Sequence, residues 1–129
     1  EAGSQKAEDP IEILSKAAHA AGIRLQIRGE LLRDTAYRRL FLLAASEAMT
    51  NAVFHANAKN LFIDLTEEGS CWEMRFTNDG AVPEGPVTEG GGLSALRYKA
   101  RSVRACMVIE SADGFALILR GRNAVETDV

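Results

Sequence analysis

The sequence has few cysteines, no long apolar run and no excess of positive charge, and each absence argues against a class of protein. Its two cysteines, Cys71 and Cys106, have no partner at metal-ligand spacing, so we expect two buried thiols in a reducing compartment. No apolar run approaches the roughly 20 residues of a membrane span, and no secretory signal precedes the domain. The net charge of -3 leaves no large positive field, which argues against binding nucleic acid through its phosphates.

The rest of the composition is that of one soluble domain. With 47% apolar residues, a chain of 129 residues is long enough to bury a core. The chain opens at Glu1, and its first nine residues are polar. We therefore expect a fragment of a longer protein, with a linker at 1–9, one domain at 10–122 and a tail at 123–129. A cytoplasmic location is expected for this domain.

Hydrophobic periodicity predicts three helices and five strands. We expect the helices at 10–21, 35–57 and 93–103, and the strands at 23–27, 60–65, 71–76, 105–110 and 115–119. The segment "TNDGAVPEGPVTEGGG", at 77–92, has five glycines among its sixteen residues and no apolar period, so it predicts a loop. The order of elements predicts an α/β (α+β) two-layer sandwich, with a mixed sheet covered by helices on one face.

Three polar residues stand out in "EAMTNAVFHANAK", at 47–59. Glu47, Asn51 and His55 are four positions apart, so on a helix they advance about 40° at each step and can converge on one ligand. Glu47 is the only formally charged residue between positions 40 and 58, and a carboxylate there should face a wet pocket or meet a cation. The stripe alone fits equally well a buried helix with a polar seam at a protein interface.

Two further motifs contain glycine. In "EGGGLSALRYKAR", at 89–101, three glycines lead directly into a helix, whose free amides and dipole favour phosphate. A flexible hinge is the alternative reading. In "TNDG", at 77–80, the carboxylate of Asp79 lies on a turn, where it could accept a hydrogen bond from an exocyclic amine or make an ordinary Asx turn.

In this order and spacing, the three motifs resemble those of the superfamily (GHKL) of gyrase-type ATPases, heat-shock chaperones, histidine kinases and mismatch-repair ATPases. The likeness is greatest to sensor histidine kinases, and it runs from about Leu14 to Leu119. "EAMTNAVFHANAK" is similar to that family's asparagine box, "NDG" to its first glycine box and "EGGGLSALRYKAR" to its second. The resemblance implies a Bergerat-type ATP-binding fold. It also implies transfer of the ATP γ-phosphate to a histidine on a separate dimerisation domain, in two-component signalling through a response regulator.

The resemblance implies ATP and Mg²⁺ as cofactors and gives the stripe three roles. Asn51 would bind the Mg²⁺ that bridges the phosphates, and His55 would touch the phosphates. Glu47 would polarise the nucleophile, because positioning and charge neutralisation are most of phosphoryl-transfer catalysis. The phosphoacceptor domain would lie outside this fragment, since His19 has no acidic residue directly after it and is a poor acceptor.

The remaining site residues come from the two glycine boxes. Asp79 would accept from the adenine amino group, and Gly80 would let the base lie against the backbone. The amides of Gly91, Gly92 and Leu93 would face the phosphates. No contact of this domain with nucleic acid or membrane is implied, although it could be the cytoplasmic part of a membrane-anchored sensor.

Three positions depart from the family pattern. They are Phe54, Val82 and Phe115, where relatives often carry a basic residue, a glycine and a threonine or serine. The departures leave open a weak ATP binder or a divergent branch with compensating residues. Two alternative functions also stay open: an anti-sigma-factor serine kinase of the same fold, and a non-catalytic nucleotide-sensing or docking module.

Overall fold

The computed structural model describes residues 9–84 and 90–123. Most of the predicted linker at 1–9, most of the predicted tail at 123–129 and residues 85–89 of the predicted loop lie outside the described residues.

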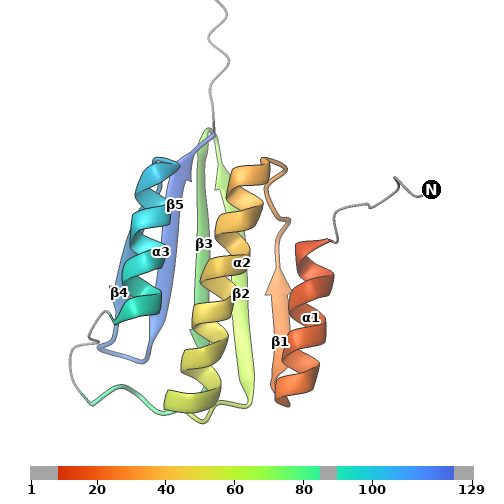
Figure 1. The fold of residues 1–129 in the computed structure, drawn as a ribbon, viewed down its shortest axis with the longest axis vertical. Helices are drawn as coiled ribbons and strands as arrows, with labels where there is room; N and C mark the ends of the chain where they lie inside the picture. The colour runs from red at the N-terminus through yellow and green to blue at the C-terminus, as the bar shows by residue number, and fades with distance from the viewer. Residues whose placement is uncertain (1–8, 85–89, 124–129) are drawn as a thin grey trace, which may run out of the picture.

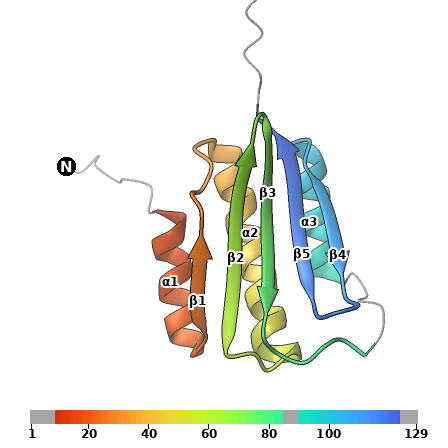
Figure 2. The ribbon, with the colours of Figure 1, turned by 180° about the vertical axis from the view of Figure 1, so that it is seen from behind.

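Five strands form one mixed sheet, and three helices lie on one of its faces (Figures 1 and 2). The helices are α1 (Pro10–Ala21), α2 (Thr35–Thr50), which continues into a π-helical turn η1 (Asn51–His55), and α3 (Gly91–Ser102). The strands are β1 (Arg24–Arg28), β2 (Asn60–Glu68), β3 (Cys71–Asn78), β4 (Cys106–Glu110) and β5 (Ala116–Arg122). Their order is β1-β2-β3-β5-β4; β1 is parallel to β2, and the other pairs are antiparallel. The predicted two-layer sandwich is confirmed.

Local signals at the ends of α1 explain why it forms where the sequence predicts. The carboxylate of Asp9 accepts from the N–H of Ile11 at 2.9 Å, and Pro10 occupies the first helical position. Gly22 ends the helix with φ 74, a left-handed conformation that glycine adopts without strain. Capping residues thus mark both ends of this helix.

The core lies between the helices and the covered face of the sheet. Alternate residues of the central strands point into it, and α2 contributes a row of alanines that brings its backbone close to the sheet. Phe41 of α2 stacks against Phe76 of β3 with ring centroids 5.9 Å apart. The largest fully buried side chains of this core are Phe41, Leu61, Ile63, Met74, Phe76, Leu96, Leu117 and Leu119. Ile118 is also fully buried, but it lies on the other face, opposite Arg75.

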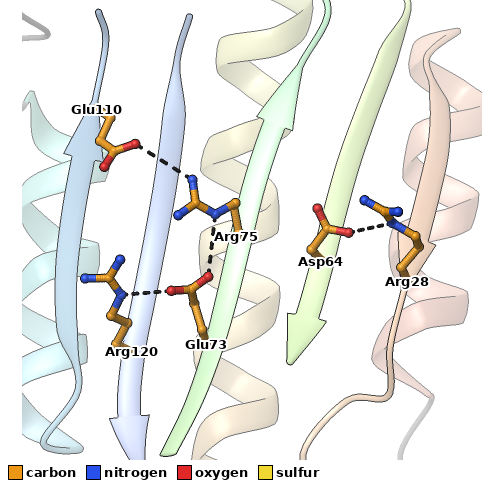
Figure 3. Close-up of polar contacts among 6 residues, drawn as sticks. All are labelled: Arg28, Asp64, Glu73, Arg75, Glu110 and Arg120. Carbon is orange, nitrogen blue, oxygen red and sulfur yellow. Dashed lines mark hydrogen bonds and ion pairs between the residues drawn. The ribbon is translucent and has the colours of Figure 1, made fainter. Parts of the chain in front are cut away.

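The other face of the sheet is polar and carries a network of ion pairs (Figure 3). Arg28 pairs with Asp64 at 2.8 Å, and Arg120 pairs with Glu73 at 2.8 Å, in each case directly across neighbouring strands. Arg75 reaches both Glu73, at 3.5 Å, and Glu110, at 3.7 Å. Exposed ion pairs of this kind stabilise a fold only weakly, but they pair the charged side chains of this solvent-exposed face.

The prediction of two buried thiols is wrong. Cys71 and Cys106 are both exposed, because they begin β3 and β4 on the polar face of the sheet. Each lies opposite an arginine of β5, Arg122 and Arg120 respectively. Period-two alternation places both thiols on the side that none of the described helices covers.

We predict that Gly121→Ala destabilises the fold. A Cβ at this position would lie 2.5 Å from Cζ2 of Trp72, a large and almost fully buried indole that would have to shift. The free energy of unfolding should fall by about 1 to 3 kcal/mol, measured by urea denaturation. Gly91→Ala is the matched control, because no atom of the described residues lies within 4 Å of its Cβ position, and equal effects of the two substitutions would contradict the packing argument.

Candidate functional site

The C-terminal end of α2 with η1 and the N-terminal end of α3 meet at the same end of the molecule (Figure 1). Between them lies a cleft of about 360 Å³. Six of the eight predicted site residues line it, together with Thr50 and Gly90: they are Glu47, Asn51, His55, Gly91, Gly92 and Leu93. Two motifs far apart in the sequence are thus brought to one place.

The helix predicted over 35–57 is not α-helical throughout. It changes at Asn51 to a π turn, in which the N–H of Ala56 donates to the carbonyl of Asn51 at 2.9 Å. Asn57 then leaves the helix with φ 50. The extra residue in this turn changes the direction of His55, so the regular stripe predicted for Glu47, Asn51 and His55 is only approximate. All three side chains nevertheless line the cleft.

The other wall of the cleft is the first turn of α3. This helix begins at Gly91, so two of the glycines that the sequence assigned to a loop are helical. The N-cap is Gly90, which has no side chain to satisfy the amides that follow. The first amides of α3, with the positive end of the helix dipole behind them, therefore face an anion-binding position.

Glu47 and Gly92 join the two walls. The carboxylate of Glu47 lies so close to the Gly92 backbone that a Cβ on residue 92 would overlap Oε1. Glycine is therefore required at this position while Glu47 keeps its place. A carboxylate at a helix N-terminus is also favoured by the helix dipole, so the contact holds Glu47 at the mouth of α3.

Asp79 does not line the cleft. Its Oδ1 accepts from the backbone N–H groups of Lys59 and Asn60, each at 2.9 Å, and its Oδ2 accepts from Asn60 Nδ2 at 2.7 Å. The hydrogen bond from the Asn60 side chain, followed by those from the Asn60 and Lys59 amides, lowers the pKa of Asp79 to about 2. The carboxylate thus ties the end of β3 to the start of β2.

The predicted Asx turn in "TNDG" is made by Asn78 instead. Its Oδ1 accepts from the Gly80 N–H at 2.8 Å. Gly80 in turn packs so tightly on the carbonyl of Ala56 that no side chain fits, and the N–H of Ala81 donates to the same carbonyl at 2.8 Å. This turn therefore abuts the residue that follows His55, just beside the cleft.

The oxygen atoms in the cleft suit a magnesium ion whose remaining ligands would be phosphates of a bound molecule. Among the described residues, no group of three or more His, Cys, Asp or Glu side chains could form a complete metal site. The cleft offers the amide oxygen of Asn51 and the carboxylate of Glu47. Mg²⁺ prefers such oxygens and commonly takes only one or two protein ligands when phosphates complete its shell.

The three residues that depart from the family pattern lie outside the cleft. Phe54 is 79% exposed and lines a separate apolar groove of about 530 Å³ between α1 and the end of α2. Val82 is exposed, and Phe115 is buried in the core. None of the three side chains lines the cleft that holds Asn51 and His55.

Sequence reasoning missed three residues near the site. Thr50 and Gly90 line the cleft, and Asn78 holds the turn beside it. A stripe with a spacing of four residues does not include Thr50, although its position next to Asn51 is a signal. Gly90 belongs to the glycine run and could have been included on that ground.

No protein-family model matches the sequence, and no curated protein sequence matches it. Solved structures do match. The blue-light activated histidine kinase EL346 of Erythrobacter litoralis has a TM-score of 0.72 and 17% identity, over 92% of this chain and 42% of that chain. The Acinetobacter baumannii histidine kinase AdeS has a TM-score of 0.68 and 16% identity, over 90% of this chain and 64% of that chain. The ATP-binding domain of PrrB from Mycobacterium tuberculosis has a TM-score of 0.63 and 21% identity, over 92% of this chain and 96% of that chain.

The chain has the fold of a histidine kinase ATP-binding domain. It spans less than two thirds of the EL346 and AdeS chains and nearly all of the PrrB domain. The described helices include none that is both long and apolar enough to cross a bilayer.

We predict that the Asp79 hydrogen bonds contribute to stability in a pH-dependent way. The pKa of this carboxyl is lowered from 3.8 to about 2, so its contribution is complete above about pH 4 and is lost as the pH falls toward 2. Urea denaturation should show Asp79→Asn less stable than the parent at pH 7, with a smaller gap at pH 2.5. Asp113→Asn, in an exposed turn, is the control. A gap that stays constant between the two pH values would contradict this role.

Proposed function

We propose that this domain binds ATP with Mg²⁺ and donates the γ-phosphate to a histidine on a separate dimerisation domain. The observation that carries the proposal is the single cleft that joins Glu47, Asn51 and His55 to the first turn of α3. The cleft would combine a phosphate site, a cation ligand and a base, which are the elements that phosphoryl transfer requires.

The phosphates would bind at the start of α3. The amides of Gly91, Gly92 and Leu93 supply donors there, and the absence of side chains on both glycines allows close approach. His55, exposed on the facing wall, would donate to the phosphates. When bound, Mg²⁺ would neutralise phosphate charge, and the amide oxygen of Asn51 would hold it.

Glu47 would act on the nucleophile, which is the acceptor histidine. Its carboxylate lies against Gly92 at the start of α3, so it would lie beside bound phosphates without needing to bind them. The base of ATP would lie beside the turn of Asp79 and Gly80, which packs against Ala56 at the end of η1. That Asp79 accepts from the adenine amine stays a prediction.

The partners follow from the reaction. The acceptor would be a dimerisation domain outside residues 1–129, and a response regulator would receive the phosphoryl group from it. Titration of residues 1–129 with ATP in the presence of Mg²⁺ tests the first requirement. Saturable binding with amide chemical-shift changes at 91–93 is expected, and no binding at millimolar ATP would overturn the proposal.

We predict that Glu47→Gln separates chemistry from binding. Glutamine keeps the shape but cannot take a proton, so ATP affinity should change by less than about 1 kcal/mol while transfer falls on the order of a hundredfold. Transfer is measured from γ-labelled ATP to the dimerisation domain, and Glu30→Gln, on an exposed loop, is the matched control. Residues 1–129 alone should label negligibly. Unchanged transfer by Glu47→Gln would remove Glu47 from the catalytic role.

We predict that Asn51→Ala abolishes the dependence of ATP binding on Mg²⁺. The substitution removes a hard oxygen ligand, so calorimetry in the presence and absence of Mg²⁺ should give similar affinities for the variant. Asn51→Asp keeps an oxygen in place and should retain a magnesium effect. If Asn51→Ala responds to Mg²⁺ as the parent does, the assignment of the metal ligand is wrong.

A further inference from the structure

A second concave site lies at the other end of α3 from the cleft (Figure 1). It has a volume of about 1180 Å³ and is lined by the end of β5 and the turn that follows α3. Because α3 has 12 residues, its two ends are about 18 Å apart, and the two sites are separate. Four arginines and two glutamates line the second site, whereas the whole chain has a net charge of -3. We call it the arginine pocket, after Arg101, Arg104, Arg120 and Arg122.

The fold uses only one of these four guanidinium groups. Arg120 pairs with Glu73 at 2.8 Å. In the part of the chain that the structure describes, Arg101, Arg104 and Arg122 have no ion pair with a carboxylate, and all three are exposed. The pocket therefore presents three guanidinium groups to solvent, each with a fork of N–H donors that matches the two oxygens of a carboxylate.

The backbone at Arg104 has a conformation that usually belongs to glycine. Its φ is 61, and it directly follows Val103, the C-cap of α3, where a left-handed glycine commonly ends a helix. The turn itself satisfies the last carbonyls of the helix. The N–H of Arg104 donates to the carbonyl of Arg101 at 3.0 Å, and the N–H of Ala105 donates to that of Ala100 at 2.8 Å. The arginine side chain is thus strained in its place and is not needed to cap α3.

Arg122 brings a second positive charge to the same place. Cys106 pairs with Arg120 where β4 begins, and two positions further out on either side come Arg104 and Arg122, which both line the pocket. Tyr37 Oη donates to the carbonyl of Arg122 at 3.0 Å and so fixes the backbone that carries this guanidinium. Like charges that gather without a carboxylate between them are unfavourable. Strain and like charge therefore meet at one corner without benefit to the fold.

We propose that the arginine pocket binds an acidic segment of a partner protein, whose carboxylates pair with the guanidinium groups of Arg104 and Arg122. Paired, forked hydrogen bonds between guanidinium and carboxylate are among the stronger polar contacts at protein surfaces. The volume exceeds the usual range of small-molecule sites, about 300 to 1,000 Å³, which favours a chain with several carboxylates over one small anion. This contact is separate from the proposed phosphoryl transfer and does not depend on it.

A labelled peptide of alternating glutamate and serine tests the proposal. Titrated into residues 1–129 at about 50 mM NaCl and followed by fluorescence anisotropy, it should bind saturably and weaken as salt is raised. The matching peptide of alternating lysine and serine should not bind. No binding of the glutamate peptide, or equal binding of both peptides, would overturn the proposal. Displacement of the glutamate peptide by an equal concentration of citrate would indicate a site for small anions and would overturn the assignment of a segment.

Charge substitutions locate the binding. Arg104→Gln and Arg122→Gln should each weaken the peptide complex by about fivefold, the scale of one exposed ion pair. Arg24→Gln is the matched control, because it removes the same charge from an exposed position on β1, away from β4 and β5 in the sheet. An equal loss in the control would mean that only net charge matters and would overturn the site. Glu68→Gln removes a carboxylate from the lining and should strengthen binding, and a weaker complex would contradict the proposal.

Arg104→Gly separates a binding role from a structural one. Glycine adopts this φ without strain, so the midpoint of urea denaturation should rise while peptide binding falls as it does in Arg104→Gln. A lower midpoint would show that the arginine supports the fold and would overturn the inference, as would unchanged binding. Saturating ATP with Mg²⁺ should leave peptide binding unchanged, because the cleft lies at the other end of α3. Competition by ATP would place the peptide in the cleft and overturn the inference, whereas failure of ATP to bind would overturn only the proposed function.

Discussion

The contact between the Glu47 carboxylate and the backbone of Gly92 is the constraint on which the cleft depends. It joins an element in the first half of the chain to one in the second, with the Glu47 carboxylate lying against the backbone of the first turn of α3. A larger residue at position 92 would displace the carboxylate or move the helix. The same contact explains the glycine run: Gly90 leaves the amides uncapped, and Gly92 makes room for the charge that faces them.

A second close contact supports the first from the opposite side. Gly80 lies against the carbonyl of Ala56, where the π turn ends, so the chain leaving β3 is held to the chain leaving η1. Asp79 then fixes that chain to the start of β2. Side-chain and backbone contacts thus link the three motifs of the sequence before any ligand is present, which is the kind of preorganisation that positions reacting groups.

Much of the fold could be predicted from the sequence because its determinants are local. Asp9, Pro10 and Gly22 mark the ends of α1, and strict alternation marks β2 and β3. The π turn at Asn51 could not be predicted, since apolar periodicity does not distinguish such a turn from the end of an α-helix. The exposure of the cysteines also required the sheet, because only strand pairing shows which face each thiol occupies.

The candidate site was partly predictable for the same reason. Side-chain spacing located Glu47, Asn51 and His55, and residue type located the glycines of α3, so their meeting in one cleft needed only the right order of elements. Asp79 and Asn78 are adjacent and similar in shape, and sequence alone could not show which side chain makes all of its hydrogen bonds within the fold. That division is decided by hydrogen bonds to β2, which come from residues about 20 positions earlier in the chain.

The parallel pairing of β1 with β2 bears on the order in which the molecule folds. Partners such as Arg24 and Asn60 can meet only after the whole segment between them, α2 and η1 included, has crossed over the sheet. The hairpin of β2 and β3 closes a far shorter loop, with Glu68 paired directly to Cys71. We therefore expect the hairpin to form first and β1 to dock late. Because Glu47 and Asn51 lie within the crossing segment, the cleft is completed only when that late step has taken place.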